Sequence, residues 1–157
     1  MRILGIDPGF DRLGFGVIDQ KGSDAVWVYH SCVQTRADQP FTERLQVIRD
    51  ETRAMIEKFQ PACVVVERLF FQTNAKTAMG VGMARGVILL AIADAGVPLV
   101  DVTPAQVKNG ITGWGGSDKR QVQEMVQRLL HLKEVPEPDD AADALAIAMV
   151  GGLLRAR

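Results

Sequence analysis

A continuous apolar run near the middle of the chain places the strongest constraint on its fold. Residues 62–66 read Ala-Cys-Val-Val-Val, and Glu67 follows them directly. Strands that are buried on both faces have this β-branched, uninterrupted composition, because helices cover the sheet on each side. The run therefore predicts a central strand in a sheet that lies between two layers of helices.

The segments around this run predict a mixed α/β sheet. Three strands are expected before it, at residues 2–7, 13–18 and 26–35, with a Gly-Ser-Asp turn at 22–24. Their connections are too short to carry a crossover, so we expect the three strands to be antiparallel neighbours. A second buried strand is expected at residues 97–102, which brings the sheet to five strands.

Helices are expected to cover this sheet. Apolar residues recur at helical spacing, and capping residues such as Thr103 before Pro104 mark helix starts. The expected helices span residues 40–59, 77–95, a short stretch from 104, a stretch capped by Ser117, and 139 or 140 to 154. We therefore predict a single domain over residues 1–157, an α/β fold in which helices flank a five-stranded mixed sheet.

Composition excludes several classes of protein. The length of 157 residues suits one domain with its own core, and the net charge of −1 argues against indiscriminate binding of nucleic acids. Residues 68–120 nevertheless carry six basic side chains against three acidic ones, which permits a polyanionic substrate. No uncharged run approaches the roughly 18 residues of a membrane span. Cys32 and Cys63 lack Cys-x-x-Cys spacing, so we interpret both as reduced core residues of a cytoplasmic protein.

Four acidic residues stand where strands end or a helix begins. Asp7 ends the first strand and Glu67 ends the buried central one, while Asp140 and Asp143 share one face at the start of the last helix. Crowded carboxylates raise each other's pKa values, which a divalent cation relieves. Oxygen ligands without a convincing His or Cys favour Mg²⁺ or Mn²⁺. Each acid alone could equally be a solvated strand end, and those at 139, 140 and 143 could complement the helix dipole.

Several short motifs occur in an order typical of one protein family. They are GIDPG at 5–9 with GFGV at 14–17, VERLF at 66–70 and DAADALA at 140–146, with ARG at 84–86 and QVK at 106–108 between them. With these motifs the chain resembles, from Ile3 to about Ala148, the RuvC family of crossover junction endodeoxyribonucleases. The resemblance implies a ribonuclease-H-like fold, a homodimer, and Mg²⁺-dependent, paired and symmetric cleavage of Holliday junctions in DNA recombination and repair. It also implies the branch-migration proteins RuvA and RuvB as partners, and no membrane.

The resemblance assigns roles to the acids. Asp7, Glu67, Asp140 and Asp143 match the family's catalytic, metal-binding positions, and the implied cofactor is two Mg²⁺ ions per site, which Mn²⁺ can replace. Asp7 would bridge both ions, Glu67 would bind one, and Asp140 with Asp143 the other. Such a pair stabilises the attacking and leaving oxygens of phosphodiester displacement and leaves 5′-phosphate ends. The family varies at the position of Asp140, so Asp139 is the alternative first acid of this motif.

Basic and aromatic residues also match positions that contact DNA in this family. Lys108 and Lys119 match lysines near the scissile phosphate, where each would act in catalysis as a point charge. Phe70 matches an aromatic residue that stacks on an unpaired base, an interaction worth about 1–3 kcal/mol, whereas Phe71 is expected in the core. Further phosphate contacts are expected at Arg68, Lys76, Arg85 and Arg120.

Small residues permit more than one interpretation. Gly82 and Gly86 match a dimer contact of the family and equally suit packing of their helix against the sheet. Gly9, Gly14 and Gly16 resemble a phosphate loop of actin-like ATPases, but 157 residues are too few for that two-domain fold. We therefore assign these three glycines to turns and close strand packing.

Two other functions are alternatives to the junction nuclease. One is a ribonuclease-H-like nuclease for another branched or hybrid nucleic acid, which the motifs outside the acids disfavour. The other is a non-catalytic protein that binds four-way junctions. The complete set of acids argues against it, because a protein that only binds DNA gains nothing from negative charge beside phosphates.

Overall fold

The apolar run forms the fourth strand of a five-stranded sheet. The computed structural model describes residues 1–69 and 75–155, with the backbone alone for 75–77, and its strand order is β3-β2-β1-β4-β5. The strands are β1 (Arg2–Asp7), β2 (Arg12–Lys21), β3 (Asp24–Gln34), β4 (Cys63–Glu67) and β5 (Leu99–Val102). β2 is antiparallel to both β1 and β3, whereas β4 is parallel to both β1 and β5. The predicted mixed sheet and its antiparallel first three strands are confirmed.

The β2–β3 hairpin is longer than the apolar pattern predicts. Gly22 adopts a φ of 60° at the turn, and Lys21 pairs directly with Asp24. A two-residue turn of this kind lets pairing continue to the tip of the hairpin. The outermost paired residues are polar and exposed, so apolar alternation does not mark them.

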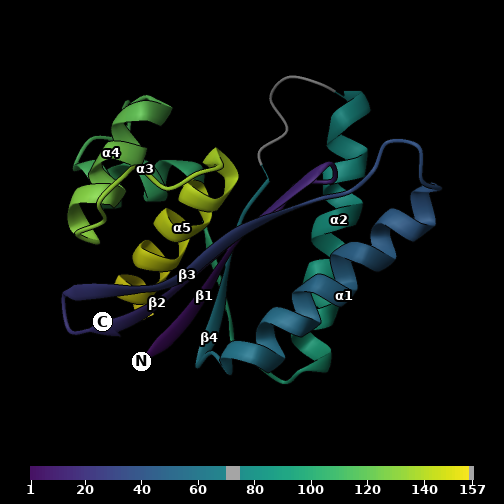
Figure 1. Cartoon of the computed structure of the whole chain (residues 1–157), viewed down its shortest axis with the longest axis horizontal. Coiled ribbons are helices and arrows are strands. Elements are labelled where there is room, and N and C mark those ends of the chain that lie inside the picture. Colours follow the sequence, from purple (N-terminus) through teal and green to yellow (C-terminus); the bar gives the residue numbers. More distant parts are fainter. Residues whose placement is uncertain (70–74, 156–157) are drawn as a thin grey trace.

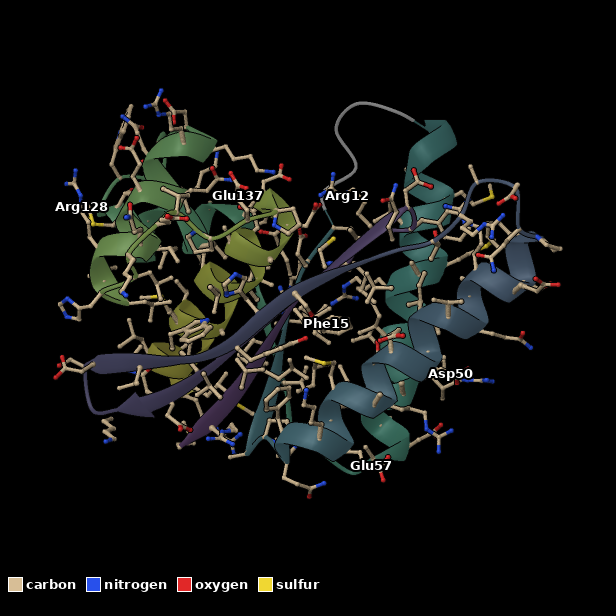
Figure 2. All side chains as sticks on the ribbon, viewed as in Figure 1. Arg12, Phe15, Asp50, Glu57, Arg128 and Glu137 are labelled. Carbon is tan, nitrogen blue, oxygen red and sulfur yellow. The ribbon has the colours of Figure 1, made fainter. Side chains whose placement is uncertain are left out.

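Helices cover both faces of the sheet (Figure 1). The helices are α1 (Phe41–Phe59) and α2 (Ala75–Asp94) on one face, and α3 (Pro104–Thr112), α4 (Lys119–Leu129) and α5 (Asp139–Arg155) on the other. Val65 packs with α3, α4 and α5, while Val64 and Val66 pack with α1 and α2, as alternation along a strand requires. Figure 2 shows Phe15 of β2 between the sheet and the α1–α2 layer. None of the helices in the described ranges is long and apolar enough to cross a membrane.

Glycines let α5 lie directly on β1 and β2. A Cβ atom added at Gly5 would collide with the carbonyl of Ala144, and one added at Gly14 would collide with the carbonyl of Asp140. At Gly16 an added Cβ would lie 2.5 Å from the backbone nitrogen of Leu145. These glycines therefore serve close helix–sheet packing. The packing brings the acidic start of α5 to the carboxyl end of β1.

The start of α4 differs by one residue from the predicted cap. Asp118, not Ser117, caps the helix: its carboxylate accepts a hydrogen bond of 2.9 Å from the backbone N–H of Gln121. The Gln121 side chain in turn accepts one of 2.9 Å from the N–H of Asp118. The Ser117 hydroxyl lies 2.6 Å from the hydroxyl of Thr112 instead. This capping box makes Lys119 the first residue of α4.

Candidate active site

The ends of two strands and the start of one helix meet at a single cleft. β1 and β4 are parallel with Ile6 opposite Val66, so Asp7 and Glu67, the next residues along, emerge side by side at one edge of the sheet. The cleft has a volume of about 290 Å³. Its lining residues are the acids Asp7, Glu67 and Asp143, the lysines Lys108 and Lys119, and the largely apolar wall of Pro104, Val107, Val122 and Ile147.

Acidic side chains crowd around Asp7. Burial raises the pKa of Asp7 to about 8, and the neighbouring carboxylates of Asp143, Glu67 and Asp140 add to this effect. The pKa of Glu67 rises to about 7, mainly through burial and then through Asp143, while Lys108 and Lys119 oppose the rise. Burial also raises the pKa of Asp143. The cleft thus holds more carboxylate than its own cations neutralise.

Lys119 is the cation most closely engaged with these acids. Its Nζ atom lies 2.6 Å from Asp139 and 3.0 Å from Asp143. Burial lowers the pKa of Lys119, but the hydrogen bonds to Asp139 and Asp143 outweigh burial and raise it above its ordinary value. Lys119 therefore stays protonated at neutral pH and faces the start of α5.

Asp140 is held from the β2 side. Its carboxylate accepts a salt bridge of 2.7 Å from Nε of Arg12, the first residue of β2, which Figure 2 labels near the start of α5. The Sγ atom of Cys32 lies 3.8 Å from the same carboxylate. Cys32 was expected in the core and is only partly buried beside this pair, whereas Cys63 is fully buried as expected.

The two candidates for the first acid of the last motif are thereby separated in space. Asp140 lies close enough to Asp7 to raise its pKa, and it lies against Arg12 at the sheet. Asp139 is about half exposed, 2.6 Å from Lys119 and 3.7 Å from Arg12. Asp140 is therefore the better candidate for the acid that acts together with Asp7.

The acids are close to one another but are engaged by basic side chains. In the parts of the chain described, no three His, Cys, Asp or Glu side chains already stand together in an arrangement that could hold a metal ion. Lys119 engages Asp143, and Arg12 engages Asp140. The carboxylates nonetheless form an all-oxygen donor set of the kind that hard divalent cations prefer.

The predicted phosphate contacts have unequal surroundings. Arg120 is 86% exposed and pairs with Glu124 one turn along α4 at 2.9 Å, and Arg68 is 58% exposed. Arg85 is not a surface contact: its side chain is 19% exposed and lies 2.6 Å from Asp101, because α2 turns it toward β4 and β5. Phe70 and Phe71 lie outside the described residues, as does the side chain of Lys76 at the start of α2.

Two residues of this region were not singled out from the sequence. Arg12 gives no signal in the sequence, because its contact with Asp140 depends on how closely α5 approaches Gly14. Asp101 does give one: it is the only charged residue between positions 97 and 102, in a strand otherwise expected to be apolar. A charge in such a strand indicates a partner, and the structure supplies Arg85.

Comparison with known proteins identifies one family. A family model described as "Crossover junction endodeoxyribonuclease RuvC" matches residues 3–151. A relative of that name from Brevibacillus brevis is 51% identical over 156 residues, which cover 99% of this chain and 94% of the relative. Another from Thermosipho melanesiensis is 49% identical over 148 residues, 94% of each chain.

Solved structures agree with these matches. The Thermus thermophilus RuvC structure superposes with a TM-score of 0.87 at 39% identity, over 96% of this chain and 92% of that one. T. thermophilus RuvC in complex with Holliday junction substrate gives a TM-score of 0.90 at 40% identity, with the same coverage. The yeast mitochondrial Holliday junction resolvase Ydc2, at 17% identity and a TM-score of 0.71, covers 98% of this chain and 78% of its own and shares the fold.

Proposed function

Because the chain belongs to the RuvC family of crossover junction endodeoxyribonucleases, we propose that it resolves Holliday junctions by paired, symmetric cleavage in DNA recombination and repair. One observation carries the proposal: three acids from two strand ends and one helix line the same cleft as two lysines. A relative with 40% identity has been solved together with Holliday junction substrate, which supports the choice of DNA.

The donor set fits a divalent cation. The carboxylates of Asp7, Glu67 and Asp143 line the same cleft, and burial together with neighbouring carboxylates raises the pKa of each, which a bound cation would reverse. We propose that these three acids, with Asp140, hold Mg²⁺, with two ions per site and Mn²⁺ as a substitute. Bound there, the ions would activate a water and stabilise the leaving oxygen, giving 5′-phosphate ends.

The basic residues of the cleft would act on the phosphate. Lys108 and Lys119 line it together with the acids, and each would present a point charge to a phosphodiester that enters. Lys119 would exchange its contact with Asp143 for the phosphate, because the metal requires that carboxylate. Arg12 would keep one oxygen of Asp140 engaged and hold this acid beside Asp7.

Contacts with the rest of the junction would come from outside the cleft. Arg68 follows Glu67 and Arg120 follows Lys119 in the sequence, and both arginines are exposed and are proposed to bind backbone phosphates. Phe70 is proposed to stack on an unpaired base, and Lys76 to add a phosphate contact, on the resemblance to the family.

A homodimer is proposed through α2. Met79, Met83 and Leu90 are exposed along this helix, and a Cβ atom added at Gly82 or Gly86 would meet no atom within 4 Å. These glycines therefore do not pack against the sheet, and they leave a smooth apolar surface for a second copy. Two active sites on one junction require two protomers.

The partner proteins and the cellular location are proposed from membership of the same family. RuvA and RuvB would deliver the junction by branch migration. Both cysteines are free, as is usual in a reducing compartment, which supports a cytoplasmic location.

The Asp7→Asn variant tests the catalytic proposal against the alternative of a protein that only binds junctions. Cleavage of a four-way junction in Mg²⁺ should fall at least about 10³-fold, because the variant loses the carboxylate shared by the whole site. Gel-shift affinity for the same junction in EDTA should stay within about twofold, since asparagine is uncharged and nearly the same shape as the protonated carboxyl group that it replaces. Cleavage that survives in this variant contradicts the assignment of the acids.

A further inference from the structure

Arg85 joins three elements at the back of the candidate active site. It projects from α2, and its Nε atom donates a hydrogen bond of 3.2 Å to the backbone carbonyl of Glu67, the last residue of β4. A terminal nitrogen of the same guanidinium lies 2.6 Å from Asp101 of β5. One side chain thus ties a helix to the ends of two neighbouring strands.

The contact with the carbonyl bears on the direction of the Glu67 side chain. Because the peptide unit is planar, a peptide held at its carbonyl oxygen also restrains the Cα atom that carries the side chain. Glu67 lines the cleft, while its carbonyl is held from the α2 layer.

The charge of Arg85 is already balanced within the protein. Asp101 accepts from Arg85 through one carboxylate oxygen, and its other oxygen lies 3.6 Å from Nε of Arg68. Arg85 is only 19% exposed, whereas Arg68 is 58% exposed. Arg68 is therefore the residue of this cluster that can reach a phosphate, and Arg85 is the one that holds the backbone.

We propose that Arg85, paired with Asp101, is a positioning residue that fixes the end of β4 so that the carboxylate of Glu67 points into the cleft. The inference rests on the proposed function, because it gives Glu67 a role in metal binding. Partners that orient a metal ligand typically change metal affinity or activity by about 10–100-fold when they are removed. Arg85 should therefore affect turnover and the response to Mg²⁺, and leave junction binding unchanged.

The test compares Arg85→Met, Arg85→Lys and the double variant Arg85→Met with Asp101→Asn. Arg53→Met, an exposed arginine on α1, serves as the matched control. In Arg85→Met, kcat should fall about 10–100-fold and the Mg²⁺ concentration for half-maximal activity should rise. Arg85→Lys should recover only part of kcat, because an ammonium cannot donate to two acceptors in the geometry of the guanidinium fork.

Junction affinity and its salt dependence separate positioning from a phosphate contact. Positioning predicts a Kd within about twofold of the unaltered protein and an unchanged slope of log K against log salt. A phosphate contact predicts a weaker Kd and a slope reduced by about 1, with kcat intact, and that result would overturn the proposal. Unchanged kcat together with an unchanged Mg²⁺ response in Arg85→Met would overturn it as well.

Loss of the fold and failure of the proposed function give different results. The double variant removes both charges, so no buried ion is left unpaired if Arg85→Met alone proves unstable. The rise in Tm on adding Mg²⁺ can be measured without DNA. A rise in the unaltered protein that is smaller in Arg85→Met and in the double variant supports positioning. A rise of equal size in all three proteins contradicts it. Failure of the unaltered protein to cut a junction would contradict the proposed function, and is seen before any variant is made.

Discussion

At the scale of single residues, Asp7 is under the greatest electrostatic strain in the cleft. Its pKa of about 8 lies far above the ordinary 3.8, mainly because of burial and then because of three neighbouring carboxylates. A carboxyl whose pKa is raised by folding stabilises the folded state fully below its unfolded pKa. That contribution is lost as the pH rises from about 4 to 8. The metal-free protein should therefore lose stability across this range.

Asp7→Asn removes the titrating group, so the variant should be more stable than the unaltered protein at pH 8.5 in EDTA. The expected gain is on the order of 2 kcal/mol, or about 4–8 °C in Tm, and it should shrink toward pH 5. Thermal unfolding followed by circular dichroism between pH 5 and 9 measures it. A variant less stable than the unaltered protein at pH 8.5 would show that ionised Asp7 does not destabilise the folded state.

Lys119 holds the position of a counter-ion among the acids. Its ammonium lies within 3.0 Å of both Asp139 and Asp143, so it competes with any cation for Asp143. Lys119→Met should therefore respond to lower Mg²⁺ concentrations in a thermal-shift titration, by several-fold. Its cleavage rate should nevertheless fall about 10²–10³-fold, because a charge aimed at the phosphate is lost. Weaker Mg²⁺ binding in this variant would contradict the competition.

At the scale of elements, the packing of α5 on the sheet builds the site. The helix lies close enough that glycine is required at positions 5, 14 and 16, and this approach carries Asp140 and Asp143 to the end of β1. The helix starts at Asp139, so its first turn supplies the last acids of the cleft. The geometry of the site is thus set by a helix–sheet contact that lies mostly outside it.

Gly14→Ala tests this packing. The added methyl group would collide with the carbonyl of Asp140, so we expect a loss of about 1–3 kcal/mol in urea unfolding and a large loss of cleavage as α5 shifts. Gly115→Ala is the control, because its methyl group meets no atom within 4 Å, so stability and cleavage should change little. Equal effects of the two changes would contradict the packing account.

Local sequence patterns predict the helices and strands better than they predict the side-chain contacts. The β-branched run at 62–66 and the short loops before it specify the sheet and its antiparallel half, because both depend on nearby residues. The pairing of Arg12 with Asp140 and the turning of Arg85 toward Asp101 depend on how distant elements pack, so no local pattern shows them. The one-residue shift of the cap from Ser117 to Asp118 arises because both residues can cap and Gln121 selects the second.

At the scale of the whole molecule, the proposed function needs two copies of the chain. The exposed apolar residues of α2 lie on the opposite side of the sheet from α4 (Figure 1), so a dimer through α2 leaves the α3–α4 side of each cleft uncovered. Under the proposed function, the exposed side chains of Arg68 and Arg120 would supply positive charge for DNA despite a net charge of −1.

Met83→Glu should break this dimer, because a charge would enter an apolar contact. Sedimentation is expected to show a monomer, and paired nicking of a junction should give way to slow single nicks. Leu129→Glu, an exposed leucine of α4, is the matched control and should leave the dimer intact. A dimer that survives Met83→Glu would place the contact elsewhere.

Cleavage of end-labelled DNA is the decisive measurement for the proposed junction nuclease. A four-way junction, a linear duplex, a fork and an RNA–DNA hybrid would be compared in Mg²⁺, Mn²⁺ or EDTA. The proposed function predicts paired symmetric nicks in the junction alone, with 5′-phosphate ends, and no nicks in EDTA. Equal cutting of duplex or hybrid, or tight junction binding with no cutting in either metal, would contradict it.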